Sequence, residues 1–202
     1  MKTQCLRLIL FITVISGIVS CSRDTRPMEE RIRESLVNRL EQYDVKGASA
    51  AVMLPEGNVQ CVTAGISHDT IAIRPEMLFA TGSITYGSSG IFTTPRDLAV
   101  WCGSLFRGEV LRESSLSEML EFNRQAAGSW CEGYGLGVFR FKRNITAWKK
   151  AYGHGGGNIG TSSYMAYLPD YDVGLVVMIN FHHGRCPDRM LKDMVKIVTD
   201  SL

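Results

Sequence analysis

Residues 173–180 form an almost uninterrupted apolar run, Val-Gly-Leu-Val-Val-Met-Ile-Asn, directly after the turn sequence Pro-Asp-Tyr-Asp at 169–172. A strand covered on only one face alternates apolar and polar residues, whereas a strand covered on both faces is apolar throughout. The run therefore predicts a strand in the centre of a sheet.

Other strands are predicted by apolar runs that turn residues separate. Residues 47–54 and 59–64 flank the sequence Pro-Glu-Gly-Asn, an arrangement typical of a β-hairpin. The second half of the chain predicts further strands at 134–141, 147–154 and 162–168.

Helices are predicted where apolar residues recur every three or four positions, as at 28–43 and 188–202. Thr94 and Pro95 indicate the start of another helix, and 115–122 predicts a short one. Each terminal helix has one apolar stripe, so we expect both to pack on the same face of the sheet. The expected fold is of the α+β class, with one mainly antiparallel sheet of about five strands flanked by N- and C-terminal helices.

The first twenty residues are typical of a secretion signal. Lys2 and Arg7 are followed by an apolar stretch that is too short for a comfortable membrane span. The stretch ends in Ile-Val-Ser-Cys at Cys21, which resembles the bacterial lipobox, whose cysteine is lipidated and becomes the new N-terminus. The alternative is an ordinary signal peptide with a chance cysteine.

These features divide the chain into a signal peptide at 1–20, a lipidated tether at 21–27 and one domain at 28–202. We expect a lipid-anchored protein of the bacterial cell envelope that faces the periplasm or lies at the outer membrane. Ser22 slightly favours the outer membrane, because it lacks the acidic character associated with retention at the inner membrane.

The charge balance argues against a nucleic-acid partner. The net charge is +2, and Lys2 and Arg7 account for that excess, so the rest of the chain is neutral overall. Nucleic-acid binding needs a basic patch or stripe, which this sequence does not predict.

Four cysteines remain for the mature domain, and they allow three full disulfide pairings that the sequence does not distinguish. They are Cys61, Cys102, Cys131 and Cys186. No cysteine pair or Cys/His cluster has the spacing of a zinc site, and we expect neither a metal nor a cofactor. His182 and His183 come closest, with Cys186, and are interpreted as part of a surface turn.

Two segments contain residue types that can carry out chemistry. Ser83 follows Gly82 and can act as a nucleophile if a base lies nearby, although most Gly-Ser pairs are simply turns. His154 precedes Gly155, Gly156 and Gly157, which would allow a substrate backbone to lie against the strand edge. The alternative for the second segment is a glycine-rich turn with a surface histidine.

Taken in order along the chain, these segments resemble the serine β-lactamase-related family, near class C β-lactamases, D-alanyl-D-alanine carboxypeptidases and related esterases. The resemblance covers nearly all of the mature chain. It includes the opening hairpin, the approach to a Ser-x-x-Lys motif, a Thr-x-x-Asp-Leu-Ala helix entry, and closing strands in which His-Gly-Gly replaces Lys-Thr-Gly. The corresponding segments are 47–65, 79–85, 89–99, 134–138, 153–156 and 178–180.

The sequence departs from this family at two points. Tyr86 occupies the position of the lysine three residues after Ser83, and no lysine lies between Lys46 and Lys142. The family also has a large helical insert between the serine motif and the Thr-x-x-Asp segment, where this chain has only a few residues. An internal deletion explains both departures; alternatively, Tyr86 begins a degenerate remnant of the family's Tyr-x-Asn motif.

Two functions follow from the resemblance. In the first, the protein is a serine hydrolase that forms an acyl-enzyme with small-molecule or peptidoglycan-like peptide, ester or β-lactam substrates. Ser83 attacks, Tyr86 or a water is the base, and His154 assists the leaving group or binds a carboxylate. Gly155, Gly156 and Gly157 line the substrate, and the N–H groups of Ser83 and Gly157 form the oxyanion hole. In the second, the protein is a non-catalytic envelope lipoprotein, a binding or vestigial module on the same sheet.

Loss of the helical subdomain would leave apolar surface uncovered. The residues expected to be exposed are Phe92, Trp101, Trp130 and Phe139. A large exposed apolar patch promotes association, so we expect marginal stability or self-association through this side.

Overall fold

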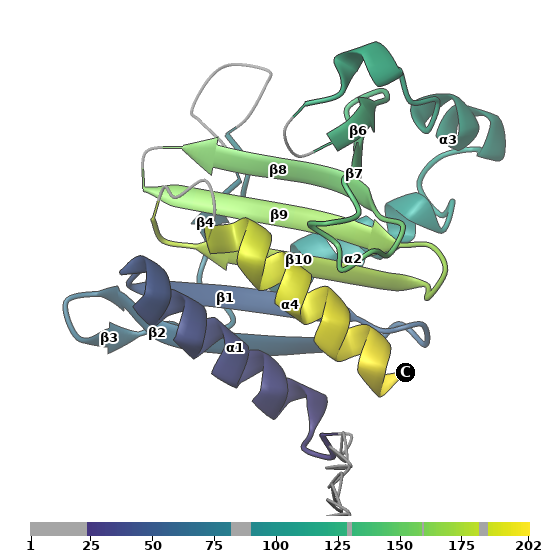
Figure 1. The fold of residues 1–202 in the computed structure, drawn as a ribbon. Helices are drawn as coiled ribbons and strands as arrows, with labels where there is room; N and C mark the ends of the chain where they lie inside the picture. Colours follow the sequence, from purple (N-terminus) through teal and green to yellow (C-terminus); the bar gives the residue numbers. More distant parts are fainter. Residues whose placement is uncertain (1–23, 82–89, 129–130, 159, 182–185) are drawn as a thin grey trace, which may run out of the picture.

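The computed structural model describes residues 24–81, 90–128, 131–158, 160–181 and 186–202 (Figure 1). An antiparallel sheet of eight strands has the order β3-β2-β1-β10-β9-β8-β7-β6, and two further strands form a separate small sheet. The strands of the large sheet are β1 (Gly47–Met53), β2 (Val59–His68), β3 (Ile71–Ala72), β6 (Cys131–Tyr134), β7 (Phe139–Phe141), β8 (Tyr152–Asn158), β9 (Thr161–Leu168) and β10 (Val173–Ile179). The small sheet pairs β4 (Phe79–Ala80) with β5 (Phe92–Thr93).

The predicted central strand is confirmed. Every residue of β10 is buried, and β10 pairs with β1 on one side and β9 on the other. Alternate residues of β10 face two different apolar clusters: Val177 packs with the terminal helices, whereas Val176 and Met178 pack with Ala99.

Helices cover both faces of the sheet. Helices α1 (Met28–Tyr43) and α4 (Cys186–Ser201) lie side by side on one face, as predicted (Figure 1). They are joined by Arg39, whose Nε donates a hydrogen bond of 2.7 Å to the Asp193 carboxylate. The other face is covered by α2 (Pro95–Phe106), and α3 (Glu113–Met119) follows it in the chain. Thr94 caps α2 as predicted, because its hydroxyl accepts a hydrogen bond from the Asp97 N–H.

The expectation of about five strands was too low. The run 134–141, predicted as one strand, folds into the end of β6, a turn and β7. The Gly135 N–H donates to the Val138 carbonyl over 2.7 Å, and Gly137 has a φ of 72°, which favours glycine. Two glycines within four residues therefore reverse the chain where the apolar pattern alone suggested continuity.

The predicted exposure of the apolar residues is partly correct. Phe92 and Trp101 are exposed, whereas Phe139 is buried and its prediction was wrong. On β7, Phe139 and Phe141 belong to the core cluster that includes the buried residues of α1 and α4. The turn at 135–138 comes directly before β7, and alternate residues of β7 then face that core. Trp130 lies outside the described residues.

Candidate active site

Strand β8 carries His154 and the three glycines singled out in the sequence. It pairs with β9 along its whole length but with β7 only at Tyr152 and Gly153. From His154 onward, no strand of the described part of the chain pairs with the side of β8 that β7 begins to cover. The glycines therefore lie within a strand, not in a turn after it, and this part of β8 is an open sheet edge.

The segment that leads to Ser83 is held against β8 and β9. Thr161 donates a hydrogen bond of 3.1 Å from its hydroxyl to the Ala80 carbonyl, and the Ser163 hydroxyl is 3.4 Å from the Thr81 carbonyl oxygen. A Cβ atom at Gly156 would lie only 1.5 Å from that same oxygen. Glycine at 156 is thus required by close approach of the backbone, and it allows Thr81 to lie directly on β8.

Thr81 is also fixed from the opposite side. Its N–H donates to the Ile91 carbonyl over 2.9 Å, so Thr81 is joined next to β8 to the chain that leads into β5. Ser83 and Tyr86 belong to that segment and lie outside the described residues, as does Cys21. Of the predicted site, the structure brings together His154, the glycines of β8 and the approach to Ser83.

His154 is half-buried and has a partner on each ring nitrogen. Its Nδ1 lies 2.6 Å from the Gly155 carbonyl oxygen and its Nε2 lies 2.7 Å from the Tyr134 hydroxyl. A carbonyl can only accept a hydrogen bond, so Nδ1 must carry a proton. In the neutral ring Nε2 then accepts from the Tyr134 hydroxyl, and in the charged ring Nε2 donates to it. The hydroxyl and the ring can therefore keep their hydrogen bond in either form of the ring.

Tyr134 was not identified as a site residue from the sequence. It lies at the end of β6, and its ring meets the His154 ring edge-on with centroids 5.8 Å apart. The sequence offers one indication of its role. Tyr134 is a polar aromatic residue that comes just before Gly135 and Gly137, where a strand ends in a turn. That signal does not reveal which other strand the hydroxyl will reach.

Tyr164 on β9 packs against the glycines of β8. A Cβ at Gly155 would lie 2.4 Å from the Tyr164 ring, so the glycine rests directly on that ring. Burial, together with the Asp188 carboxylate, raises the pKa of Tyr164 well above its usual range. Burial likewise raises the pKa of Asp188. Tyr164 is therefore a buried phenol on whose ring β8 rests at Gly155.

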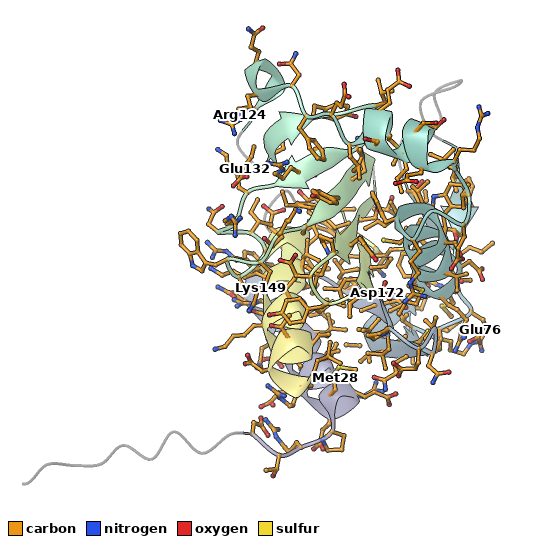
Figure 2. The ribbon with its side chains drawn as sticks, turned by 90° about the vertical axis from the view of Figure 1, so that its right-hand side faces the viewer. Met28, Glu76, Arg124, Glu132, Lys149 and Asp172 are labelled. Carbon is orange, nitrogen blue, oxygen red and sulfur yellow. The ribbon has the colours of Figure 1, made fainter. Side chains whose placement is uncertain are left out.

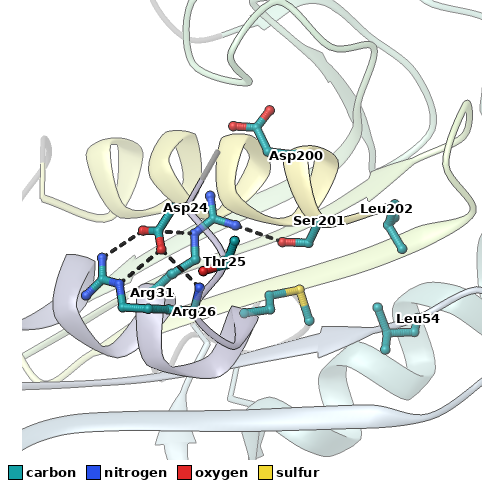
Figure 3. Close-up of a pocket in the computed structure, with 9 residues that line it drawn as sticks. Asp24, Thr25, Arg26, Arg31, Leu54, Asp200, Ser201 and Leu202 are labelled. Carbon is teal, nitrogen blue, oxygen red and sulfur yellow. Dashed lines mark hydrogen bonds and ion pairs between the residues drawn. The ribbon is translucent and has the colours of Figure 1, made fainter. Parts of the chain in front are cut away.

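Two pockets lie away from the glycines of β8. One of about 630 Å³ lies where the chain enters α1 and the C-terminal end of α4 meets it (Figure 3). Asp24 there bonds to Arg26 and Arg31, and Arg31 donates to the Ser201 hydroxyl. The second, of about 450 Å³, is lined by Phe122, Arg124, Glu132 and Arg140.

Other kinds of site were also sought in the described part of the chain. Within it, no group of three or more His, Cys, Asp or Glu side chains could hold a metal ion. No disulfide joins the four cysteines of the domain, all of which are described. In that same part of the chain, no helix is long and apolar enough to cross a membrane.

Comparison with known proteins agrees with the geometry of the sheet. Residues 41–196 match the family described as Beta-lactamase. A comparison with curated proteins gave no match.

Solved structures give the same result for the fold. D-amino acid amidase from Ochrobactrum anthropi SV3 in complex with D-phenylalanine superposes with a TM-score of 0.70 at 10% identity, covering 87% of this chain and 99% of that one. Its complex with L-phenylalanine amide gives 0.65 at 12% identity, covering 86% and 97%. SurE with D-Leu gives 0.64 at 11% identity, covering 87% and 76%.

At these identities the structural likeness establishes the fold alone, but the family match extends over most of the sequence and includes β1, β8 and β10. On that match, the chain belongs to the beta-lactamase family.

Proposed function

We propose that the protein is a serine hydrolase that forms an acyl-enzyme at Ser83. The observation that supports this most is the contact between the Thr81 carbonyl and Gly156, which fixes the chain two residues before Ser83 against the strand that carries His154. In a serine hydrolase the nucleophile must lie beside a strand edge that can bind the substrate and beside a proton acceptor.

The reaction assigns a role to each residue. The Ser83 hydroxyl attacks the substrate carbonyl and transfers its proton to Tyr86 or a water, while the N–H groups of Ser83 and Gly157 stabilise the oxyanion. The leaving group receives a proton from the Tyr134–His154 pair, and water then hydrolyses the acyl-enzyme. The open edge of β8 at Gly155–Gly157 binds the substrate backbone.

For the substrate class we propose amides of amino acids and short peptides, including peptidoglycan-like peptides. The structural neighbours include a D-amino acid amidase solved with D-phenylalanine and with L-phenylalanine amide. A strand edge bordered by glycines suits a short peptide or amide in an extended conformation.

Labelling with a fluorophosphonate probe tests the nucleophile. We expect the protein to be labelled, and we expect Ser83→Ala to abolish labelling. Ser117→Ala, at an exposed serine of α3, is the matched control and should be labelled like the unmodified protein. D- and L-phenylalanine amide are then offered as substrates, with release of ammonia as the readout.

A second candidate function is a non-catalytic binding module on the same sheet. Tyr86 favours it, because a tyrosine accepts a proton from serine only as a phenolate, and the unperturbed pKa of tyrosine is about 10. The short stretch between Ser83 and Thr94, where the resemblance leads us to expect a helical insert, also favours it. Absence of labelling in folded protein would select this candidate, whereas labelling that persists in Ser83→Ala would show that the reactive residue is not Ser83.

We further propose that Cys21 is lipidated and anchors the domain to a membrane of the bacterial cell envelope through the tether 21–27. Support comes from the lipobox-like sequence alone. Fractionation of cells tests it: the unmodified protein should sediment with membranes, whereas Cys21→Ala should be released. A Cys21→Ala protein that stays with membranes would overturn this assignment.

A further inference from the structure

The pocket lined by Phe122, Arg124, Glu132 and Arg140 contains none of the residues given a role in the proposed hydrolysis. It opens between the short helix η1 (Arg124–Ala126) and the hairpin of β6 and β7. Arg124 and Glu132 lie close together at one end of the molecule, far from Glu76 (Figure 2). Three of the four described residues that line it are charged, which favours a polar ligand.

Arg140 is the most informative residue of this pocket. Its Nε is buried and has no hydrogen-bond partner. Its guanidinium lies over the Phe122 ring, with Cζ 4.7 Å from the centroid. A buried donor without a partner is costly, and the ring holds the guanidinium in place by a cation–π contact. The Phe122 ring therefore holds the Arg140 guanidinium in a fixed position at the pocket, with its Nε turned away from solvent.

The charged side chains that line the pocket indicate which ligand groups would suit it. Two guanidinium groups, on Arg124 and Arg140, share the pocket with the Glu132 carboxylate, and no ion pair between described residues involves any of the three. A planar carboxylate is the natural partner of guanidinium groups, and an ammonium is the natural partner of Glu132. A ligand that carries both groups on neighbouring atoms satisfies the whole set.

We propose that this pocket binds a free α-amino acid, with its carboxylate on Arg140 and Arg124 and its ammonium facing Glu132. The site is distinct from the β8 edge, although the same hairpin carries Tyr134. Binding does not depend on catalysis at Ser83, so the proposal can fail or succeed independently of the proposed hydrolase.

Nuclear magnetic resonance of the ¹⁵N-labelled full chain tests the proposal, because arginine Nε–H groups give their own signals. The Arg140 signal is assigned by its loss in Arg140→Gln. D- and L-alanine, alaninamide and N-acetylalanine serve as probes, since the last two lack the carboxylate and the ammonium in turn. We expect saturable movement of the Arg140 signal with at least one alanine enantiomer. Alaninamide and N-acetylalanine should each bind about tenfold more weakly than that enantiomer.

Variants separate binding from folding. Arg124→Gln, at an exposed position, should weaken alanine binding about tenfold while the melting temperature stays unchanged. Glu132→Gln should weaken binding of alanine but not of N-acetylalanine. Arg74→Gln, at the exposed Arg74–Glu76 pair, is the matched control and should bind normally. The proposal is overturned if alanine and alaninamide move the Arg140 signal equally, if neither alanine enantiomer moves it, or if Arg124→Gln binds alanine as the unmodified protein does.

Discussion

Arg107 and Asp172 form an ion pair of 2.7 Å that joins the end of α2 to the turn between β9 and β10. The Arg107 guanidinium also donates to the carbonyls of Leu54 and Pro55, in the turn between β1 and β2. Tyr167 donates its hydroxyl to the same carboxylate oxygen over 2.7 Å. One arginine therefore links a helix end to two neighbouring hairpin turns of the sheet.

Asp172→Asn should lower the free energy of unfolding by about 1 kcal/mol at pH 7, since the pair is partly exposed. Burial alone would raise the pKa of Asp172, but the hydrogen bonds from Arg107 and Tyr167 outweigh it, and the pKa is lowered. The stabilisation is therefore complete above the unfolded pKa of about 3.9 and disappears as the pH falls through the folded value. Urea unfolding at pH 7 and at decreasing pH measures this difference.

The choice of asparagine isolates the charge. Asp172 has a φ of 53°, a conformation that asparagine tolerates well, so the backbone of the turn is preserved. Asp170→Asn, at an exposed neighbour, is the control and should change stability little. Equal losses in the two variants, or a loss in Asp172→Asn that persists at low pH, would show that the ion pair does not contribute as described.

The sequence predicted the elements whose pattern is local. Helix α1 spans Met28–Tyr43, the range expected from its apolar spacing, and β10 is central because its run is apolar on both faces. The antiparallel order also followed from short turns. The division of 134–141 into two strands did not follow, because Gly135 and Gly137 can occur within a strand as well as in a turn.

The candidate site could be predicted only in part. His154 and its glycines were identified by composition, but the contact with Tyr134 depends on how β6, β7 and β8 are placed side by side. The contact of Gly156 with Thr81 joins residues far apart in the sequence. Neither relationship has a periodic signal, because both depend on the register of strands and not on the pattern within one.

Gly156→Ala should destabilise the protein by about 1–3 kcal/mol, because a methyl group there overlaps the Thr81 carbonyl and must displace it. Under the proposed function it should also abolish labelling at Ser83, since the approach to that residue is moved. Denaturant unfolding and fluorophosphonate labelling measure the two effects.

The matched control for this change is Gly174→Ala in β10, where the new Cβ would lie 3.2 Å from the Ala99 carbonyl oxygen. It should perturb stability less and leave labelling intact. If Gly156→Ala were as stable and as reactive as the unmodified protein, the close contact of Thr81 with β8 would have no role in the site.

Tyr134→Phe removes the hydroxyl that contacts His154 and leaves the ring in place. Because Tyr134 is 37% exposed, we expect a stability change of no more than about 1 kcal/mol. If the pair transfers protons, hydrolysis of a phenylalanine amide should slow by about 10²-fold, with an altered pH profile. Tyr171→Phe, whose hydroxyl accepts from Lys149, is the control and should keep the normal rate and profile. An unchanged rate and pH profile in Tyr134→Phe would remove the pair from the mechanism.

Exposed apolar side chains on β5 and α2 should cause the unlipidated domain to self-associate. Phe92 is 58% exposed and Trp101 is 49% exposed, and Ile91, directly before Phe92 in the chain, is 62% exposed. Apolar side chains of this size favour burial against another surface, and a second copy supplies one.

The double change Phe92→Ser/Trp101→Gln should therefore shift the protein towards monomer. Trp148→Gln, at a tryptophan that is 71% exposed in the loop between β7 and β8, should not. Static light scattering over a range of concentrations measures the shift. A monomeric unmodified domain, or equal association of all three proteins, would show that this surface does not mediate contact between copies.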